Sequence, residues 1–221
     1  MLLHRWAMLL LRPRKVAYAG GSPITDQDSF RIRNDDGDET TATWKANVNT
    51  DDSLDVDTNW RIRFLIQNTG TGNLVFDVGE GWRLQYNLAA AGWNDVTGAS
   101  SVVRASASPN VTDNIVTTQQ LGAGVFDTTS ASRFDEGDGL AGVPSGSEVF
   151  NDGDESEPEF CFQILSGDVT NGQTLQLRIV HTQPGSNTVL DSYTNTPTIT
   201  VVEGGAPANL RRYSLALSGV G

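Results

Sequence analysis

Acidic residues gather in four short segments of this 221-residue chain, and they are the first candidates for chemistry. The segments read NDDGDE (34–39), DDSLDVD (51–57), FDEGDG (134–139) and NDGDESEPE (151–159). Carboxylate and amide oxygens around a glycine are typical ligands for calcium, which takes roughly six to eight oxygens. A calcium site would therefore use the acids nearest the loop glycines, namely Asp35, Asp36, Asp38, Asp152 and Asp154.

The spacing of these acids does not fit an EF-hand loop. With Asn34, Asp36 and Asp38 as the first, third and fifth loop residues, Glu39 would replace the loop glycine and Lys45 the closing glutamate. An Asn-Asp-Asp-Gly run also forms a tight turn unaided, because Asn and Asp tolerate the left-handed region and Gly readily takes a positive φ. We interpret the segments as turns with a solvated acidic rim, keep calcium as the alternative, and expect no other cofactor.

The other residue types that could act in catalysis form no recognisable catalytic motif, so we expect that the protein is not an enzyme. The chain contains no GxSxG, Walker, GxGxxG or HExxH motif. A zinc site takes three or four Cys or His ligands, and we expect none here because the chain has one Cys and two His, of which His4 lies in the arm. We expect His181 to be structural and Cys161 to be half-buried, opposite Phe160 and Phe162. A glycosidase would need one carboxyl isolated in an apolar pocket, whereas these acids lie among other acids.

Charge is distributed unevenly along the chain. The whole sequence has 15 Lys and Arg against 27 Asp and Glu, for a net charge of −12. Residues 1–20 carry four bases and no acid, which leaves 11 bases and 27 acids, a charge of −16, for the remainder. An acidic body repels nucleic acid, so we exclude DNA and RNA as its partners.

The first 29 residues are expected to form an arm outside the main domain. Their apolar run is too short to span a bilayer and precedes its bases, unlike a signal peptide. Pro13 and the acidic body argue against membrane binding. Apolar side chains that an arm cannot bury usually mark an interface. We expect the partner-binding residues to be Trp6, Leu9, Leu10, Arg12 and Arg14.

The rest of the chain has the period-two pattern of β-strands. NWRIRFLIQ (59–67), for example, alternates apolar and polar residues between turn-forming clusters. The pattern predicts an all-β, antiparallel β-sandwich, jelly-roll or immunoglobulin-like, over residues 30–203. Residues 98–158 are expected to form long loops projecting from one edge, and residues 204–221 a tail that adds a strand. The predicted core comprises Trp60, Ile62, Phe64, Trp82, Leu84, Phe160, Phe162, Leu177 and Ile199.

Several segments resemble a β-rich module encoded by tailed bacteriophages. These are FRIRNDDGDETTATWKANVNTD, DTNWRIRFLIQNTG, WRLQYNLAAAGWNDV and LDSYTNTPTITV, in that order over residues 30–202. The resemblance implies a virion structural protein without catalytic residues. We expect a capsid decoration (cement) or head-fibre protein, bound through the arm to the major capsid protein and to sister subunits as a homo-oligomer on the particle. The alternative is a tail-associated module that binds a host-surface glycan through the 98–158 loops.

Overall fold

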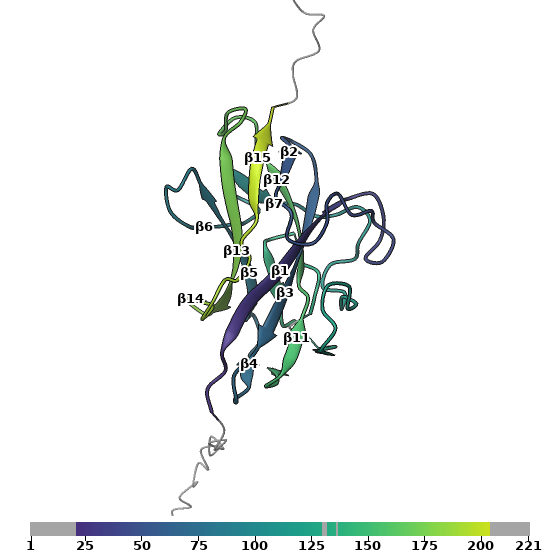
Figure 1. Cartoon of the computed structure of the whole chain (residues 1–221), viewed down its shortest axis with the longest axis vertical. Coiled ribbons are helices and arrows are strands. Elements are labelled where there is room, and N and C mark those ends of the chain that lie inside the picture. Colours follow the sequence, from purple (N-terminus) through teal and green to yellow (C-terminus); the bar gives the residue numbers. More distant parts are fainter. Residues whose placement is uncertain (1–20, 130–131, 136, 204–221) are drawn as a thin grey trace, which may run out of the picture.

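The computed structural model describes residues 21–129, 132–135 and 137–203, which form an all-β fold (Figure 1). Within these residues there are fifteen strands and no helix, so no described helix could cross a membrane. The strands are β1 (Thr25–Asn34), β2 (Asp52–Asp55), β3 (Trp60–Asn68), β4 (Leu74–Phe76), β5 (Gly81–Leu88), β6 (Asn94–Asp95), β7 (Val103–Ala105), β8 (Val125–Phe126), β9 (Leu140–Gly142), β10 (Glu148–Phe150), β11 (Asp154–Ser156), β12 (Glu159–Ile164), β13 (Thr174–Gln183), β14 (Ser186–Val189) and β15 (Thr198–Val202).

One sheet, which we name sheet A, is built around β3. The whole of β3 pairs antiparallel with β1 on one edge, with Arg33 opposite Arg61. Its other edge is shared by β12 and β11, so that Glu159 of β12 lies opposite Arg63. Strand β7 extends the sheet beyond β12, and β8 extends it beyond β11. This register places the arginines of two strands and a glutamate of a third side by side.

The second large sheet, sheet B, is built around β13 and β5. These two strands pair antiparallel from Leu175 to Thr182, and β15, β14, β6, β9 and β2 complete the sheet. Strands β4 and β10, which are distant in the sequence, form a separate two-stranded antiparallel sheet. Most pairs are antiparallel, as expected, but β8 with β11 and β2 with β15 are parallel. The predicted all-β, sandwich-like class is therefore confirmed, with two short parallel pairs at its margins.

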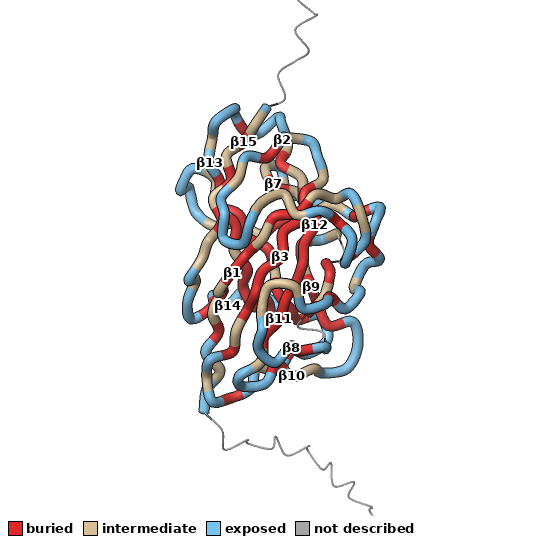
Figure 2. Tube along the Cα trace, turned by 45° about the vertical axis from the view of Figure 1, so that its right-hand side comes forward, coloured by how far each residue is buried: buried red, intermediate tan, exposed pale blue. Residues whose placement is uncertain are grey.

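The apolar core lies between the two sheets and contains all nine predicted residues. It fills one face of β3 with Ile62 and Phe64 and the facing side of β13 with Leu177 and Ile179, all with no exposed surface. Figure 2 shows the buried segments concentrated along the central strands, with exposed segments in the connecting loops. The period-two pattern thus identified the core correctly because strand alternation sends every second side chain to the same face.

Two expectations about segment boundaries were wrong. Strand β1 begins at Thr25, so five residues assigned to the arm belong to sheet A. The 98–158 segment does not simply project from one edge: it contributes β7 to β11 and packs against the outer face of sheet A. Within this segment, residues 114–121 form no strand and contain only an isolated bridge from Val116 to Arg133.

Candidate functional site: a buried layer of arginines and carboxylates

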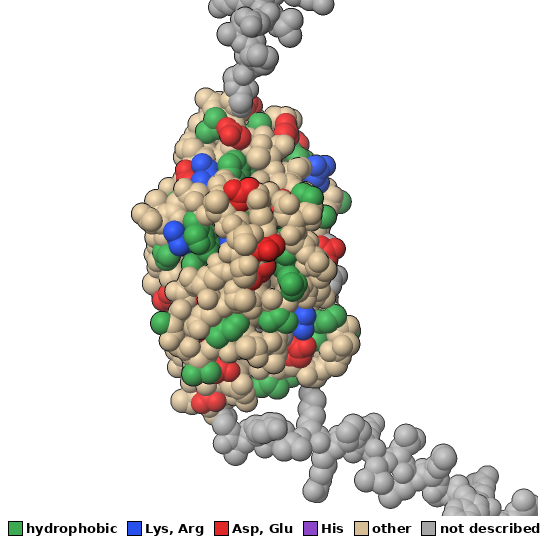
Figure 3. All heavy atoms as spheres, turned by 90° about the vertical axis from the view of Figure 1, so that its right-hand side faces the viewer, with side chains coloured by type: hydrophobic (Ala, Val, Ile, Leu, Met, Phe, Trp, Pro, Cys, Tyr) green, Lys and Arg blue, Asp and Glu red, His purple; other side chains and the backbone are tan. Residues whose placement is uncertain are grey.

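The outer face of sheet A carries three arginines that are shielded from solvent. Arg33 of β1 and Arg61 and Arg63 of β3 alternate with core residues, so they point away from the apolar core, as the sequence pattern predicted. Nevertheless, all three are 0% exposed. Loops cover them, and few Lys or Arg side chains appear on the loop-covered side of the molecule (Figure 3). The arginines therefore form a second, polar interior.

Arg63 is the centre of this layer. Its Nε donates to Glu159 Oε2 at 2.6 Å, and its Nη1 donates to the Thr118 carbonyl oxygen and contacts Glu157 Oε2 at 3.3 Å. Its Nη2 forms ion pairs with Glu159 and with Glu39. Burial alone would lower the pKa of Arg63, but attraction to Glu159 and Glu39 outweighs it, and the pKa is raised. The guanidinium stays charged.

Glu159 is shared by all three arginines. Its Oε2 also accepts from Arg33 Nη1 at 3.2 Å, and its Oε1 lies 2.8 Å from Arg61 Nε in an ion pair not aligned as a hydrogen bond. Burial lowers the pKa of Arg33; Glu159 opposes this effect, whereas Arg61 and Arg63 add to it. One carboxylate thus joins β1, β3 and β12 through charge as well as through the sheet.

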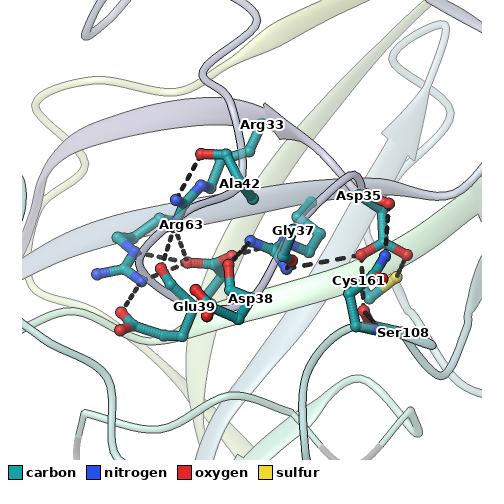
Figure 4. Close-up of polar contacts among 12 residues, drawn as sticks. Arg33, Asp35, Gly37, Asp38, Glu39, Ala42, Arg63, Ser108 and Cys161 are labelled. Atoms are coloured by element: carbon teal, nitrogen blue, oxygen red, sulfur yellow. Dashed lines mark hydrogen bonds and ion pairs between the residues drawn. The ribbon is translucent and has the colours of Figure 1, made fainter.

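The β1–β2 loop is fixed onto the arginines through its backbone carbonyls (Figure 4). Arg33 donates to the carbonyl oxygens of Glu39 and Ala42, both at 2.7 Å. Arg61 donates to those of Gly37 and Asp38 at 2.9 and 3.1 Å. Because an arginine presents several donors in a planar fork, it can satisfy two carbonyls of one loop at the same time.

Glutamates hold the second covering loop, residues 118–122. Glu39 accepts from the Thr118 amide at 2.9 Å. Glu157 accepts from the amides of Gln120, Leu121 and Gly122, each at 2.8 Å. Burial would raise the pKa of Glu39, but Arg63 and the Thr118 amide lower it overall. Glu39 therefore remains ionised and acts as an anchor; it is not poised to donate a proton near neutral pH.

The candidate calcium ligands near residue 36 already accept hydrogen bonds from other residues of the protein. Asp35 accepts from Ser108 Oγ at 2.6 Å and from Asn59 Nδ2 at 3.1 Å. Asp36 accepts from Thr43 at its amide and hydroxyl, and Asp38 accepts from Thr40 and Thr41 in the same way. The expected solvated rim is correct for Asp36 and Asp38. It is wrong for Glu39, which is 5% exposed, and for Asp35, whose side chain is 3% exposed.

Asp152 lies in the turn between β10 and β11, and Asp154 begins β11, far from the other three candidates. Asp154 accepts from Asn151 Nδ2 at 2.9 Å, and the Asp152 amide donates to Asn73. Strand β11 pairs near Gln67, whereas the β1–β2 loop begins opposite Trp60 at the other end of β3. At about 3.3 Å per residue these ends are separated by on the order of 20 Å, so the five acids cannot form one site. In the described ranges, no group of three or more His, Cys, Asp or Glu is arranged to hold a metal ion.

The remaining predicted positions divide between buried and undescribed residues. Cys161 faces the outer side of sheet A as expected, but it is completely buried with Val111 and Phe134, and burial raises the pKa of its thiol. His181 packs against both Phe76 and Trp82, with ring centroids 4.9 and 6.1 Å away. The predicted partner-binding residues Trp6, Leu9, Leu10, Arg12 and Arg14 lie outside the described residues.

A hollow of about 350 Å³ opens between the β1–β2 loop and residues 110–118. It is lined by Asp38, Glu39, Thr40, Asn110, Val111, Thr112, Ile115, Val116 and Thr118. The lining is mixed, since Ile115 and Val116 are partly exposed beside hydroxyl and amide groups. It is the place where the 98–158 segment and the β1–β2 loop present a joint surface to solvent.

Comparisons with known proteins assign no family. No protein-family model matches the chain, and neither the curated proteins nor the solved structures gave a significant match. The fold and the site nevertheless define a class of architecture. The chain is an all-β, sandwich-like domain in which a buried layer of ion pairs fastens two long loops to one sheet.

Proposed function

We propose that this chain is a structural protein of a bacteriophage virion, attached to the outside of the head as a decoration or head-fibre protein. The resemblance of residues 30–202 to phage-encoded β modules is one support. The buried ion pairs of sheet A are another, because they hold long loops in one arrangement on a body that must withstand exposure on a particle. On this proposal the protein acts by binding and not by catalysis.

The relative position of the two chain ends carries this proposal. Residues 21 and 203 lie at opposite ends of the domain (Figure 1). The basic, apolar segment 1–20 therefore joins the acidic body at one end only. A segment placed in this way can bind an apolar, acidic surface of the major capsid protein or of a sister subunit while the body projects outwards.

A truncated chain that begins at Gly21 tests the proposal. It keeps all of β1 and the Ser22 carbonyl that accepts from Thr71, so it should melt at the same temperature as the full chain. It should fail to bind particles that lack the protein and fail to form the native oligomer. A full-length variant with Arg12→Glu and Arg14→Glu keeps the length of the arm but reverses two of its positive charges, so it measures how much of the binding depends on that charge. Undiminished particle binding by the truncated chain would overturn attachment through the arm.

A tail-associated module that binds glycan through the 98–158 segment is the second candidate. The hollow lined by Asn110, Thr112 and Thr118 favours it, since these amide and hydroxyl groups suit a hydroxyl-rich ligand. The copy number in purified particles separates the two candidates. Hundreds of copies would agree with decoration of the head, whereas only a handful would agree with a place on the tail.

A further inference from the structure

The outer face of sheet B carries an ordered row of polar side chains. The register places Arg178 of β13 opposite Gln85 of β5, and Gln85 opposite Asp95 of β6. Two residues away along each strand, and so on the same face, Gln176 lies opposite Asn87. The intervening residues of β13 belong to the apolar core, so this row faces away from it. Sheet B therefore presents amides and a guanidinium at fixed positions.

Two aromatic rings enclose the guanidinium of Arg178. Its Cζ lies 4.1 Å from the centre of the Trp93 ring and 5.3 Å from that of Tyr193. Its Nε donates to Gln85 Oε1 at 3.0 Å. The Tyr193 hydroxyl is itself anchored, because it donates to the Ile179 carbonyl oxygen at 2.9 Å. These contacts hold Arg178 in one position. Both rings are partly exposed, so the guanidinium lies at the surface.

Arg178 has no carboxylate partner within the part of the chain that the structure describes. The buried arginines of sheet A all contact glutamates, whereas no ion pair is formed by Arg178. Asp95, at the end of the same row, bonds instead to Gln85 and to Asn187. Burial lowers the pKa of Arg178, with Tyr193 opposing the effect. A partly desolvated cation without an anion is a ready site for a carboxylate.

Hydroxyl and amide groups line a hollow on each side of Arg178 along β13. One hollow, of about 400 Å³, is lined by Asp95, Thr182, Gln183, Gly185, Ser186 and Asn187. The other, of about 390 Å³, is lined by Asn87, Ala89, Ala90, Thr174, Gln176 and Thr198. Only one of these twelve residues is charged. Such neutral donors and acceptors suit a ligand rich in hydroxyl groups.

The second hollow borders a strained turn that positions Trp93. Ala89 and Ala90 have φ values of 47° and 61°, and the Ala91 amide donates to the Leu88 carbonyl oxygen. A two-residue turn with positive φ at both positions normally has Asn or Gly there, so two alanines carry backbone strain. Asn87 then accepts from the Gly92 amide, next to Trp93. Strain of this kind is retained most often where a fixed geometry serves a ligand.

We propose that the outer face of sheet B binds an acidic oligosaccharide. Its carboxylate pairs with the guanidinium of Arg178, its sugar rings pack on Trp93 and Tyr193, and its hydroxyls enter the two flanking hollows. The acidic body would repel such a ligand at long range, but screening limits this repulsion to about 8 Å at physiological salt. Amides and hydroxyls around one cation favour a sugar acid over an acidic peptide. The proposal does not depend on attachment of the protein to a capsid.

Titration calorimetry of the full chain with two carboxylate-bearing probes tests this site. The probes are an oligogalacturonate and an oligomer of sialic acid, which distinguish a uronic acid from a nonulosonic acid. The fully methyl-esterified form of each probe is its matched neutral ligand, and polyglutamate is the acidic peptide. The variants are Arg178→Gln, Arg178→Lys and, as the control, Arg104→Gln, which removes a surface guanidinium bonded to Gln163 on sheet A. Thermal melting checks that each variant is folded.

We expect at least one acidic probe to bind and its methyl ester to bind at least tenfold more weakly. Arg178→Gln should weaken binding at least tenfold. Arg178→Lys should weaken it less, because lysine keeps the charge but lacks the planar fork. Arg104→Gln should not change it. The proposal is overturned if neither probe binds at millimolar concentration, if ester and acid bind equally, if polyglutamate binds as tightly as the better probe, or if folded Arg178→Gln binds like the natural chain.

Discussion

Arg63 of β3 and Glu159 of β12 lie directly opposite each other in sheet A and are joined by a hydrogen bond of 2.6 Å with no solvent exposure. Such a pair is costly to bury, and its net contribution to stability over an apolar pair can be small. Losing one partner is a different matter, because an uncompensated charge is then left in the interior. Single substitutions on the outer face of sheet A should therefore change stability strongly, although strand alternation alone predicts only a polar face there.

Glu159→Gln should lower the free energy of unfolding by about 3–5 kcal/mol, because it leaves three arginines without their shared carboxylate. Urea denaturation followed by tryptophan fluorescence measures the change. Glu148→Gln is the control, since Glu148 pairs with Arg133 where both side chains are partly exposed, and such pairs contribute at most about 1 kcal/mol. Equal, small effects of the two substitutions would show that the layer is not important for stability.

Phe162→Ala should cost about 3–5 kcal/mol of unfolding free energy, because Phe162 is fully buried between the sheets. Val75→Ala removes apolar surface from a residue that is 46% exposed and should change stability little. Chemical denaturation of both variants gives the comparison. A loss below about 1 kcal/mol for Phe162→Ala would contradict its place in the core.

His181 should contribute a loss of stability as the pH drops from 7 towards 5, whereas buried Asp135, whose pKa is raised by burial, acts in the opposite direction. Burial against Phe76 and Trp82 lowers the pKa of His181, with Glu80 opposing the effect. The unfolded chain then binds a proton at a pH where the folded chain does not, so protonation favours unfolding. His181→Phe should flatten this part of the profile of unfolding free energy against pH. An unchanged slope would assign the dependence to other groups.

Cys161 should be inert towards thiol reagents in the folded protein. It is completely buried, and the same burial raises the pKa of its thiol, so little thiolate is available. Labelling with a chromogenic disulfide should be slow in buffer and complete in denaturant, with a rate in buffer that follows the opening of the structure. Rapid labelling of the folded chain would mean that the loop carrying Phe134 opens readily.

Calcium should leave the melting temperature unchanged. The oxygens of Asp36 and Asp38 already accept from threonine amides and hydroxyls, and the acids near residue 153 lie at the other end of β3. A ligand that binds the folded state would raise the melting temperature by mass action. Melting curves in millimolar calcium and in chelator should therefore coincide. A rise with calcium would instead support the metal site considered from the sequence.

The sequence was sufficient to predict the core but not the polar layer. Alternation in β3 assigned Ile62 and Phe64 to one face and Arg61 and Arg63 to the other, and both assignments are correct. Burial of the arginines depends on which strand lies beside β3 and which loops fold over it, and neither is encoded in local periodicity. One signal in the sequence did point to the polar layer: the polar face of β3 carries arginine and not lysine. The planar guanidinium of arginine pairs with buried carboxylates better than the lysine ammonium does.

The way Glu157 holds its loop has a consequence for how the molecular surface can diversify. The carboxylate binds the backbone amides of Gln120, Leu121 and Gly122 and not their side chains. Gln120 also contributes through its side chain, which donates to Glu39, so the position where side-chain identity is largely separate from this anchoring is Leu121. Related chains could exchange Leu121 and acquire new surface chemistry while retaining the same loop path. Glu157 would then keep the backbone of the loop in place while the partly exposed side chain at this position varies. The constraint on sequence would fall mainly on the few residues beneath the loop.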